Sequence, residues 1–139
     1  MKEFMEELKK KLNIEEYDLR TYSPLVLAFI GDAVYELLVR TKIVAEGNAP
    51  VHKLHYKSSG LVKAKTQAIM MQRIEEFLKE EEINIYKRGR NAKSGTNPKN
   101  VSVTEYRIAT GFEALVGYLY LKEDYSRMID LIKIGLESL

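Results

Sequence analysis

Residues 27–36 read Leu27-Ala28-Phe29-Ile30-Gly31-Asp32-Ala33-Val34-Tyr35-Glu36, an apolar run that contains one glycine and two acids. Apolar residues at three- and four-residue spacing predict a helix that packs into a core. Asp32 stands on this helix, and Glu36, four residues later, shares its face. An ionised carboxylate buried without a partner is costly, so we expect something cationic to meet Asp32.

A second segment repeats this pattern. Residues 109–117 read Ala109-Thr110-Gly111-Phe112-Glu113-Ala114-Leu115-Val116-Gly117, with an acid among small and apolar residues. Small residues on the face of Glu113 would let another helix approach closely, and the segment around Asp32 has similar small positions. Two helices crossing at these positions would bring Asp32 and Glu113 together.

Two interpretations of this acidic pair remain open. Hard oxygen ligands suit Mg²⁺, which often uses only one or two carboxylates and keeps several waters. Such an ion polarises a phosphoryl oxygen and generates a hydroxide nucleophile, so the pair favours phosphodiester chemistry. The alternative is that both acids form structural ion pairs with Arg40, Arg107 or a lysine.

The rest of the chain also predicts helices. Ser23-Pro24 is a helix start, and Gly47 ends a helix that runs from Pro24 to about Glu46. Ser102 and Glu105 match a capping box, which opens a helix to about Leu121. Further helices are expected at residues 4–12, 58–79 and 81–90, and after Asp124. No segment alternates as a strand would, so we predict an all-α fold in a single domain over residues 1–139.

Charge is unevenly distributed, although the formal net charge is only +2. Residues 47–74 and 83–104 contain no acid. Their candidate phosphate-binding bases are Lys57, Lys63, Lys65, Lys87, Arg88, Arg90, Lys93 and Lys99. Asn91, Ser94 and Thr96 add hydrogen-bond donors within an expected exposed loop over residues 91–100. Such stretches can bind a polyanion through its phosphates. The alternative is two ordinary solvated faces.

Absent features exclude several classes of protein. There is no cysteine, which excludes disulfides, thiol nucleophiles and cysteine metal sites and fits a reducing cytoplasm. The N-terminus has acids where a signal peptide would have an apolar core. No apolar run approaches the about 18 residues of a spanning helix. We therefore expect a soluble, cytoplasmic protein with no membrane association.

Three of these segments together resemble one family. Residues 27–36 resemble the signature helix of the ribonuclease III family, and residues 112–120 resemble its second acidic motif. Residues 87–96, Lys87-Arg88-Gly89-Arg90-Asn91-Ala92-Lys93-Ser94-Gly95-Thr96, look like the basic loop of the Mini-ribonuclease III subgroup, as do residues 57–59 and 63–68. The resemblance covers roughly residues 22–122, in family order.

This resemblance implies a ribonuclease III-type endonuclease domain that acts as a homodimer on double-stranded RNA with Mg²⁺. It implies no separate RNA-binding domain, which fits the 139 residues. The implied role is maturation of the precursor of 23S large-subunit ribosomal RNA, and a large-subunit ribosomal protein is a further conceivable partner. By position, Asp32 and Glu113 are the catalytic, metal-binding acids, and the bases and donors of the two acid-free stretches hold RNA.

Two positions depart from the wider family pattern. Ala28 stands where the signature has a glutamate, and Thr110 stands where the second motif has an aspartate. Both departures resemble the Mini-ribonuclease III subgroup. They leave more coordination positions of the metal ion to water or to RNA oxygens. A catalytically silent RNA-binding relative is the main alternative, although the presence of both Asp32 and Glu113 argues against it. A helical adaptor protein would leave the acid-free basic stretches unexplained.

Overall fold

The computed structural model describes residues 2–93, 99 and 101–139, and within them it contains helices and no strand. The α-helices are α1 (Lys2–Lys11), α2 (Pro24–Ala45), α3 (Val51–Val62), α4 (Ala64–Ile74), α5 (Glu80–Asn91), α6 (Val103–Leu121) and α7 (Tyr125–Glu137), with short 3-10 turns η1 (Leu19–Thr21) and η2 (Glu75–Phe77). The all-α prediction is confirmed. None of the described helices is long and apolar enough to cross a membrane.

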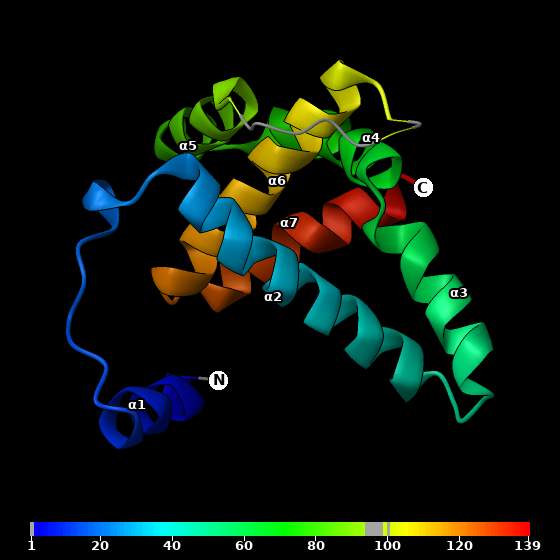
Figure 1. Ribbon diagram of the computed structural model, residues 1–139, viewed down its shortest axis with the longest axis horizontal. Coiled ribbons are helices and arrows are strands. Elements are labelled where there is room, and N and C mark those ends of the chain that lie inside the picture. The colour runs from blue at the N-terminus through cyan, green and yellow to red at the C-terminus, as the bar shows by residue number, and fades with distance from the viewer. Residues whose placement is uncertain (1, 94–98, 100) are drawn as a thin grey trace.

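Helix α6 is the centre of the fold, and helices α2, α4, α5 and α7 pack around it (Figure 1). Its buried residues lie on every face, as expected for a helix surrounded by others: Ala109, Thr110, Gly111, Phe112, Ala114, Leu115, Val116, Gly117 and Leu119. Helix α2 crosses it and continues outward to meet α3. The two segments that carry Asp32 and Glu113 are therefore the two most closely associated helices.

Tyr35 joins α2 to three other helices in the core. Its ring meets that of Phe112 edge-to-face, with centroids 5.0 Å apart and planes at 89°. Its hydroxyl donates a hydrogen bond to the Leu61 carbonyl at 2.8 Å and lies 3.3 Å from the sulfur of Met70. A buried tyrosine needs such a partner for its hydroxyl. Helix α2 is thereby fixed to α6, to the end of α3 and to α4.

The predicted single helix over residues 58–79 is wrong, because the chain forms three elements around this region. Helix α3 starts earlier, at Val51 after Pro50, and Lys63 is extended, with φ −67° and ψ 153°. The break is stabilised by side chains of α4: Thr66 Oγ1 donates to the Gly60 carbonyl at 2.7 Å and Gln67 Nε2 to the Val62 carbonyl at 2.9 Å. These bonds satisfy carbonyls that the end of α3 leaves unpaired.

Other helix boundaries agree with the sequence. Ser23 Oγ accepts a hydrogen bond from the backbone of Val26 at 3.3 Å, and Ser102 Oγ accepts one from Glu105 at 3.0 Å. Asp124 Oδ1 accepts from the backbone of Arg127 at 3.4 Å and opens α7. After α2, Gly47 has φ +144°, a conformation that other residues rarely adopt.

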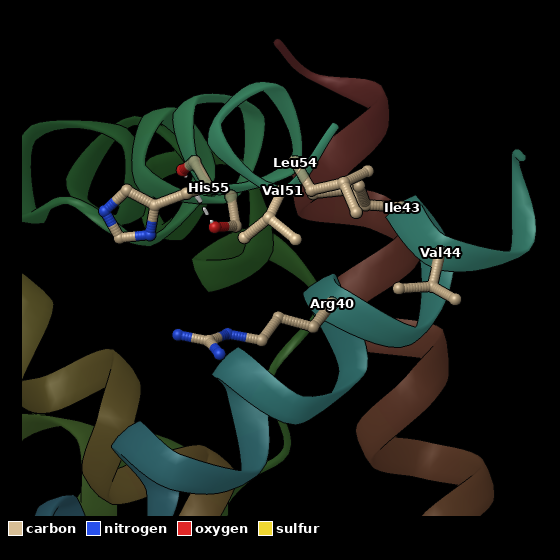
Figure 2. A pocket seen from close by; sticks show the side chains of 7 residues that line it. Arg40, Ile43, Val44, Val51, Leu54 and His55 are labelled. Carbon is tan, nitrogen blue, oxygen red and sulfur yellow. Dashed lines mark hydrogen bonds between the residues drawn. The ribbon is translucent and has the colours of Figure 1, made fainter. Parts of the chain in front are cut away.

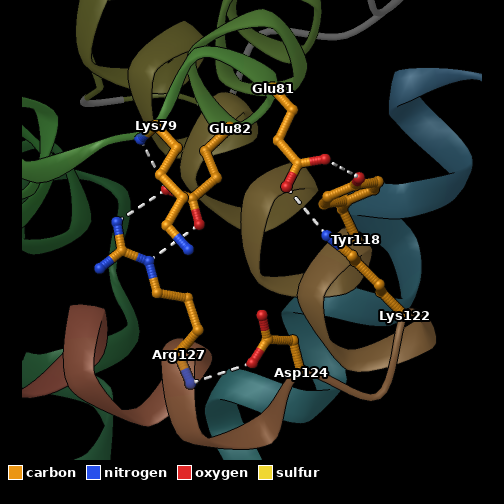
Figure 3. Close-up of polar contacts among 7 residues, drawn as sticks. All are labelled: Lys79, Glu81, Glu82, Tyr118, Lys122, Asp124 and Arg127. Atoms are coloured by element: carbon orange, nitrogen blue, oxygen red, sulfur yellow. Dashed lines mark hydrogen bonds and ion pairs between the residues drawn. The ribbon is translucent and has the colours of Figure 1, made fainter.

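Helices α5 and α7 are joined by a buried ion pair (Figure 3). Glu82 is only 1% exposed, and both its side-chain oxygens accept hydrogen bonds from Arg127, from Nε at 2.9 Å and Nη2 at 2.8 Å. The backbone of Lys79 donates a third bond at 2.8 Å. Burial alone would raise the pKa of the Glu82 carboxyl, but these bonds outweigh it and hold the pKa below its ordinary value. Glu82 is thus a fully satisfied buried charge.

Candidate active site

The site forms where α2 and α6 cross with their backbones in contact. A Cβ added to Gly31 would lie 1.8 Å from the Glu113 carbonyl oxygen, and one added to Gly117 would lie 1.9 Å from the Leu27 carbonyl oxygen. Neither position has room for a side chain, since real Cβ atoms essentially never approach so closely. Asp32 follows Gly31 directly, so this crossing brings its carboxylate to that of Glu113.

The Glu113 carboxyl is partly buried and has an unusual electrostatic environment. Burial first, and then the neighbouring Asp32 carboxylate, raises the pKa of Glu113 to about 8, against the opposing effect of a hydrogen bond from Gln67. Two carboxylates that approach each other disfavour double ionisation unless a cation joins them. The pair is therefore arranged as a cation-binding site would be.

The ion-pair alternative is not observed among the described residues. Neither Asp32 nor Glu113 forms a salt bridge there, and Arg40 instead pairs with Glu36 at 2.9 Å. The structure also corrects one expectation: Asp32 is exposed on the single chain, and only Glu113 is substantially covered. An exposed Asp32 beside a covered Glu113 leaves the pair open to solvent on one side.

Gln67 is a third member of this site, and sequence reasoning gave it no role. Its side chain is 1% exposed, and its Nε2 lies 3.5 Å from Glu113 Oε2 while bonding the Val62 carbonyl. Its Oε1 is buried without a hydrogen-bond partner among the described residues. The one available signal was a neutral amide within the otherwise apolar segment Gln67-Ala68-Ile69-Met70-Met71.

These groups match the ligand preference of Mg²⁺. The carboxylates of Asp32 and Glu113 are hard oxygen donors, which Mg²⁺ prefers over nitrogen or sulfur. No cluster of three or more potential ligand side chains (His, Cys, Asp or Glu) occurs in the described part of the chain. Since Mg²⁺ keeps several waters and binds through one or two carboxylates, the pair fits this ion without further acids.

The predicted RNA-binding residues lie on several elements and are mostly exposed. Lys57 is on α3, Lys63 is at the break before α4, and Lys65 is on α4. Lys87, Arg88, Arg90 and Asn91 form the end of α5, Lys93 follows it, and Lys99 lies in a turn. Ser94 and Thr96 lie outside the described residues. None of the lysines and arginines named here forms an ion pair with a residue that the structure describes.

The end of α5 is bordered by two hollows. One of about 380 Å³ is lined by two cations, Arg90 and Arg107, by one acid, Glu75, and by polar and apolar neighbours. The other, of about 730 Å³, is shallow and is lined by Lys87, Arg88 and Asn91 with Pro24 of α2. Cationic side chains beside surface hollows suit the phosphates of a nucleic-acid backbone.

Comparison with known proteins gives a consistent result. Residues 25–124 match the model of the Ribonuclease III domain family. The chain is 56% identical over 115 residues to a Mini-ribonuclease 3 of Thermoanaerobacter sp. (strain X514), covering 83% of this chain and 81% of that protein. It is 48% identical over 118 residues to a Mini-ribonuclease 3 of Clostridium tetani, covering 84% and 78%. A crystal structure of a Fusobacterium nucleatum protein superposes with a TM-score of 0.80 at 34% identity, covering 88% of this chain and 99% of that chain.

Proposed function

This chain belongs to the Mini-ribonuclease 3 group of the ribonuclease III family, whose members are endoribonucleases. On this basis we propose which residues carry out the reaction and which RNA is the substrate. Asp32 and Glu113 are the catalytic acids of a Mg²⁺-dependent hydrolase of double-stranded RNA, contained in one catalytic domain. The observation that carries this proposal is their approach at the α2–α6 crossing, with no cationic side chain among the described residues to neutralise them.

The two acids have different parts in this proposal. Both would hold the ion, which when bound polarises a phosphoryl oxygen and lowers the pKa of a water molecule. Asp32, being exposed, can be reached by a bound substrate, while Glu113 is covered and held from behind by Gln67. The backbone contact between Gly31 and Glu113 fixes their relative position before RNA arrives.

RNA binding is assigned to the acid-free stretches. Lys63 is at the break before α4 and Lys65 is in the first turn of α4, both close in sequence to Gln67, so we expect a duplex at the acids to pass them. The end of α5, with its two hollows, supplies a second group of cations. Contacts of this kind reach phosphates and 2′-hydroxyls, through which double-stranded RNA is recognised by shape.

We also propose that the protein acts as a homodimer through the outer face of α2. Large apolar side chains lie exposed at helical spacing along it: Val26 (50%), Phe29 (81%), Leu37 (58%) and Val44 (62%). At its end, Val44 and Val51 line an apolar hollow of about 190 Å³ between α2 and α3, with Arg40 and His55 at its edge (Figure 2). A second copy would cover this apolar face and present one site to each strand of a duplex.

Light scattering tests the dimer separately. We expect a mass near twice the 16.0 kDa of one chain at micromolar concentration, and a shift toward one chain mass in Phe29→Glu. A single-chain mass for the unaltered protein would contradict the dimer.

The resemblance to the Mini-ribonuclease III subgroup suggests a natural substrate. We propose that the protein matures the precursor of 23S ribosomal RNA in the cytoplasm, where a large-subunit ribosomal protein bound to that RNA would be a further partner. Cleavage rates can be compared for duplexes from precursor 23S ribosomal RNA, for the corresponding mature duplexes and for duplexes of unrelated sequence. Cleavage of the unrelated duplexes as fast as the precursor duplexes would contradict this assignment.

The central test is cleavage of long duplex RNA with and without Mg²⁺. Asp32→Asn and Glu113→Gln should each lower kcat by about a thousandfold, since loss of metal-based charge stabilisation is worth several kcal/mol. Both substitutions are near-isosteric, so circular dichroism should show an intact fold and RNA affinity should change little. Full activity in either variant would remove that residue from the mechanism, and cleavage without a divalent ion would remove the metal.

A further inference from the structure

We propose that Gln67 is a positioning residue of the active site, which holds the Glu113 carboxylate in its metal-binding orientation; this inference rests on the function proposed above. Gln67 comes from α4, the third helix at the site, and no motif assigned it a role. It is not in reach of solvent, since its side chain is 1% exposed, so it acts through Glu113 and not on RNA directly.

The orientation of the Gln67 amide is determined by the Val62 carbonyl. That carbonyl can only accept, and the amide group beside it at 2.9 Å must therefore be the nitrogen. The same nitrogen has a second proton, and Glu113 Oε2 lies 3.5 Å away in position to receive it. The contact is longer than a strong hydrogen bond, as expected for a site whose geometry tightens when its ligand is present.

The other half of the amide is unsatisfied. Gln67 Oε1 is buried with no partner among the described residues, which is unfavourable for an amide oxygen in a folded protein. The nitrogen of the same amide faces Glu113, so this unpaired acceptor belongs to a buried amide that reaches the candidate site.

Gln67 is also one of few polar side chains, among those that the structure describes, available to orient Glu113. Ala28, four residues before Asp32, and Thr110, three residues before Glu113, carry no carboxylate, so neither helix places a further acid at these two positions. Thr110 donates its hydroxyl to the Tyr106 carbonyl at 3.0 Å. The Gln67 amide is the remaining side-chain donor on Glu113 among the described residues. Partners of metal-binding carboxylates are commonly worth about 10–100-fold in metal affinity or activity.

Gln67→Met tests the inference, because methionine has a similar volume and no amide. We expect kcat to fall about tenfold while the KM for duplex RNA stays within about twofold. We also expect Mn²⁺ binding to the RNA-free protein, followed by electron paramagnetic resonance, to weaken about tenfold. If the unaltered protein binds no Mn²⁺ without RNA, the Mg²⁺ concentration for half-maximal cleavage decides, and it should rise by the same factor.

Thr66→Val is the matched control. Thr66 is the neighbouring residue, is 7% exposed and also bonds a carbonyl at the end of α3, but its hydroxyl donates to Gly60 and not to Glu113. We expect this variant to lose thermal stability without losing metal affinity. Equal metal affinity in Gln67→Met and Thr66→Val would overturn the inference. Should Gln67→Met melt below the assay temperature, Gln67→Leu removes the same donor and serves in its place.

A double variant separates this inference from the function on which it rests. In a Glu113→Gln background, Gln67→Met should have no further effect on metal binding, because its effect passes through Glu113. Loss of activity in Asp32→Asn and Glu113→Gln with normal behaviour of Gln67→Met would overturn the role of Gln67 alone. Full activity in those two acid variants would instead overturn the proposed function.

Discussion

Glu82 and Glu113 are two covered carboxylates in one small protein, and the fold treats them in opposite ways. Glu82 accepts three hydrogen bonds and meets a cation from α7, so its pKa is below the ordinary value. Glu113 has one long contact to an amide and a second carboxylate as its neighbour, so its pKa is about 8. The Glu82 charge is neutralised by Arg127 within the protein, whereas no cationic side chain that the structure describes neutralises Glu113.

This difference separates structural charge from functional charge. A buried acid that is paired with a cationic side chain has a structural role. A covered acid that has no such partner and a raised pKa is a candidate functional residue. Local choices that contradict the stability of a fold are expected at functional sites. The two glutamates allow this rule to be tested within a single chain.

The largest effect should come from breaking the satisfied pair. Arg127→Met leaves Glu82 buried and unpaired, so we expect the free energy of unfolding to fall by about 3–5 kcal/mol. Urea denaturation followed by circular dichroism measures it. Cleavage per folded molecule should stay near that of the unaltered protein, because α7 carries no site residue.

Replacing both partners sharpens the result. In Glu82→Leu with Arg127→Met, no charge is left buried, and most of the lost stability should return. A double variant as unstable as Arg127→Met alone would mean that Arg127 acts by packing and by its bond to the Phe77 carbonyl at 2.6 Å.

The next effect is on the pH dependence of stability. Because the pKa of Glu113 is raised from 4.5 to about 8, its proton is held in the folded protein and released by the unfolded chain between these values. The contribution of Glu113 to the free energy of unfolding is therefore fully present below pH 4.5 and is lost as the pH rises to about 8. The loss is on the order of 1–2 kcal/mol after allowance for partial exposure. Glu82 has the opposite sign: its contribution is present above pH 4.5 and is lost as pH falls.

Chemical denaturation without divalent ions, at several pH values, measures both slopes. Glu113→Gln should flatten the slope between pH 5 and pH 8 and leave the acid limb unchanged. Added Mg²⁺ should stabilise the unaltered protein most at the alkaline end, since binding to the ionised carboxylate removes the penalty. An identical alkaline slope in Glu113→Gln would show that another group is responsible.

The smallest effect extends the comparison to cations. Arg127 is neutralised within the protein, whereas Arg88 and Arg90 have no carboxylate partner among the described residues. If they bind phosphates, Arg88→Ala with Arg90→Ala should raise the KM more than it lowers kcat. The slope of log affinity against log salt should fall by about 1 for each phosphate that the variant no longer neutralises.

Affinity measured at several salt concentrations decides this last point. Arg20, which is exposed but paired with Asp18 at 2.9 Å, offers a control: Arg20→Ala should leave the salt slope unchanged. Superimposable salt curves for the double variant and the unaltered protein would move RNA binding to Lys57, Lys63 and Lys65.

Local sequence signals predicted much of this fold. Ser23, Pro24 and Gly47 fixed the bounds of α2 because caps and glycines act over a few residues. The break at Lys63 was missed since Gly60, three residues earlier, is compatible with a continuous helix, and the bonds that stabilise the break come from side chains further on. The Glu82–Arg127 pair was missed because its members are 45 residues apart and each resembles a surface charge in sequence.

The candidate site divides in the same way. Asp32 and Glu113 were recognisable because an acid within a small, apolar segment conflicts with its surroundings. Gln67 gave a much weaker signal, a neutral amide in an apolar segment, since the burial and the neighbours that give it a role are known only from the fold. The exposure of Asp32 was likewise invisible, because it depends on which side of α2 meets α6.

The contact of Gly31 and Gly117 with the opposite backbones has a consequence for how the protein opens. No side chain separates α2 from α6 at those points, so the acids come into register in the same event that docks the two helices. A folded state without an assembled site is then hard to populate, and the site should come apart only with the core. In hydrogen exchange, the amides around Asp32 and Glu113 would belong to the slowest cooperative unit of the chain, although active sites usually occupy the more labile ones.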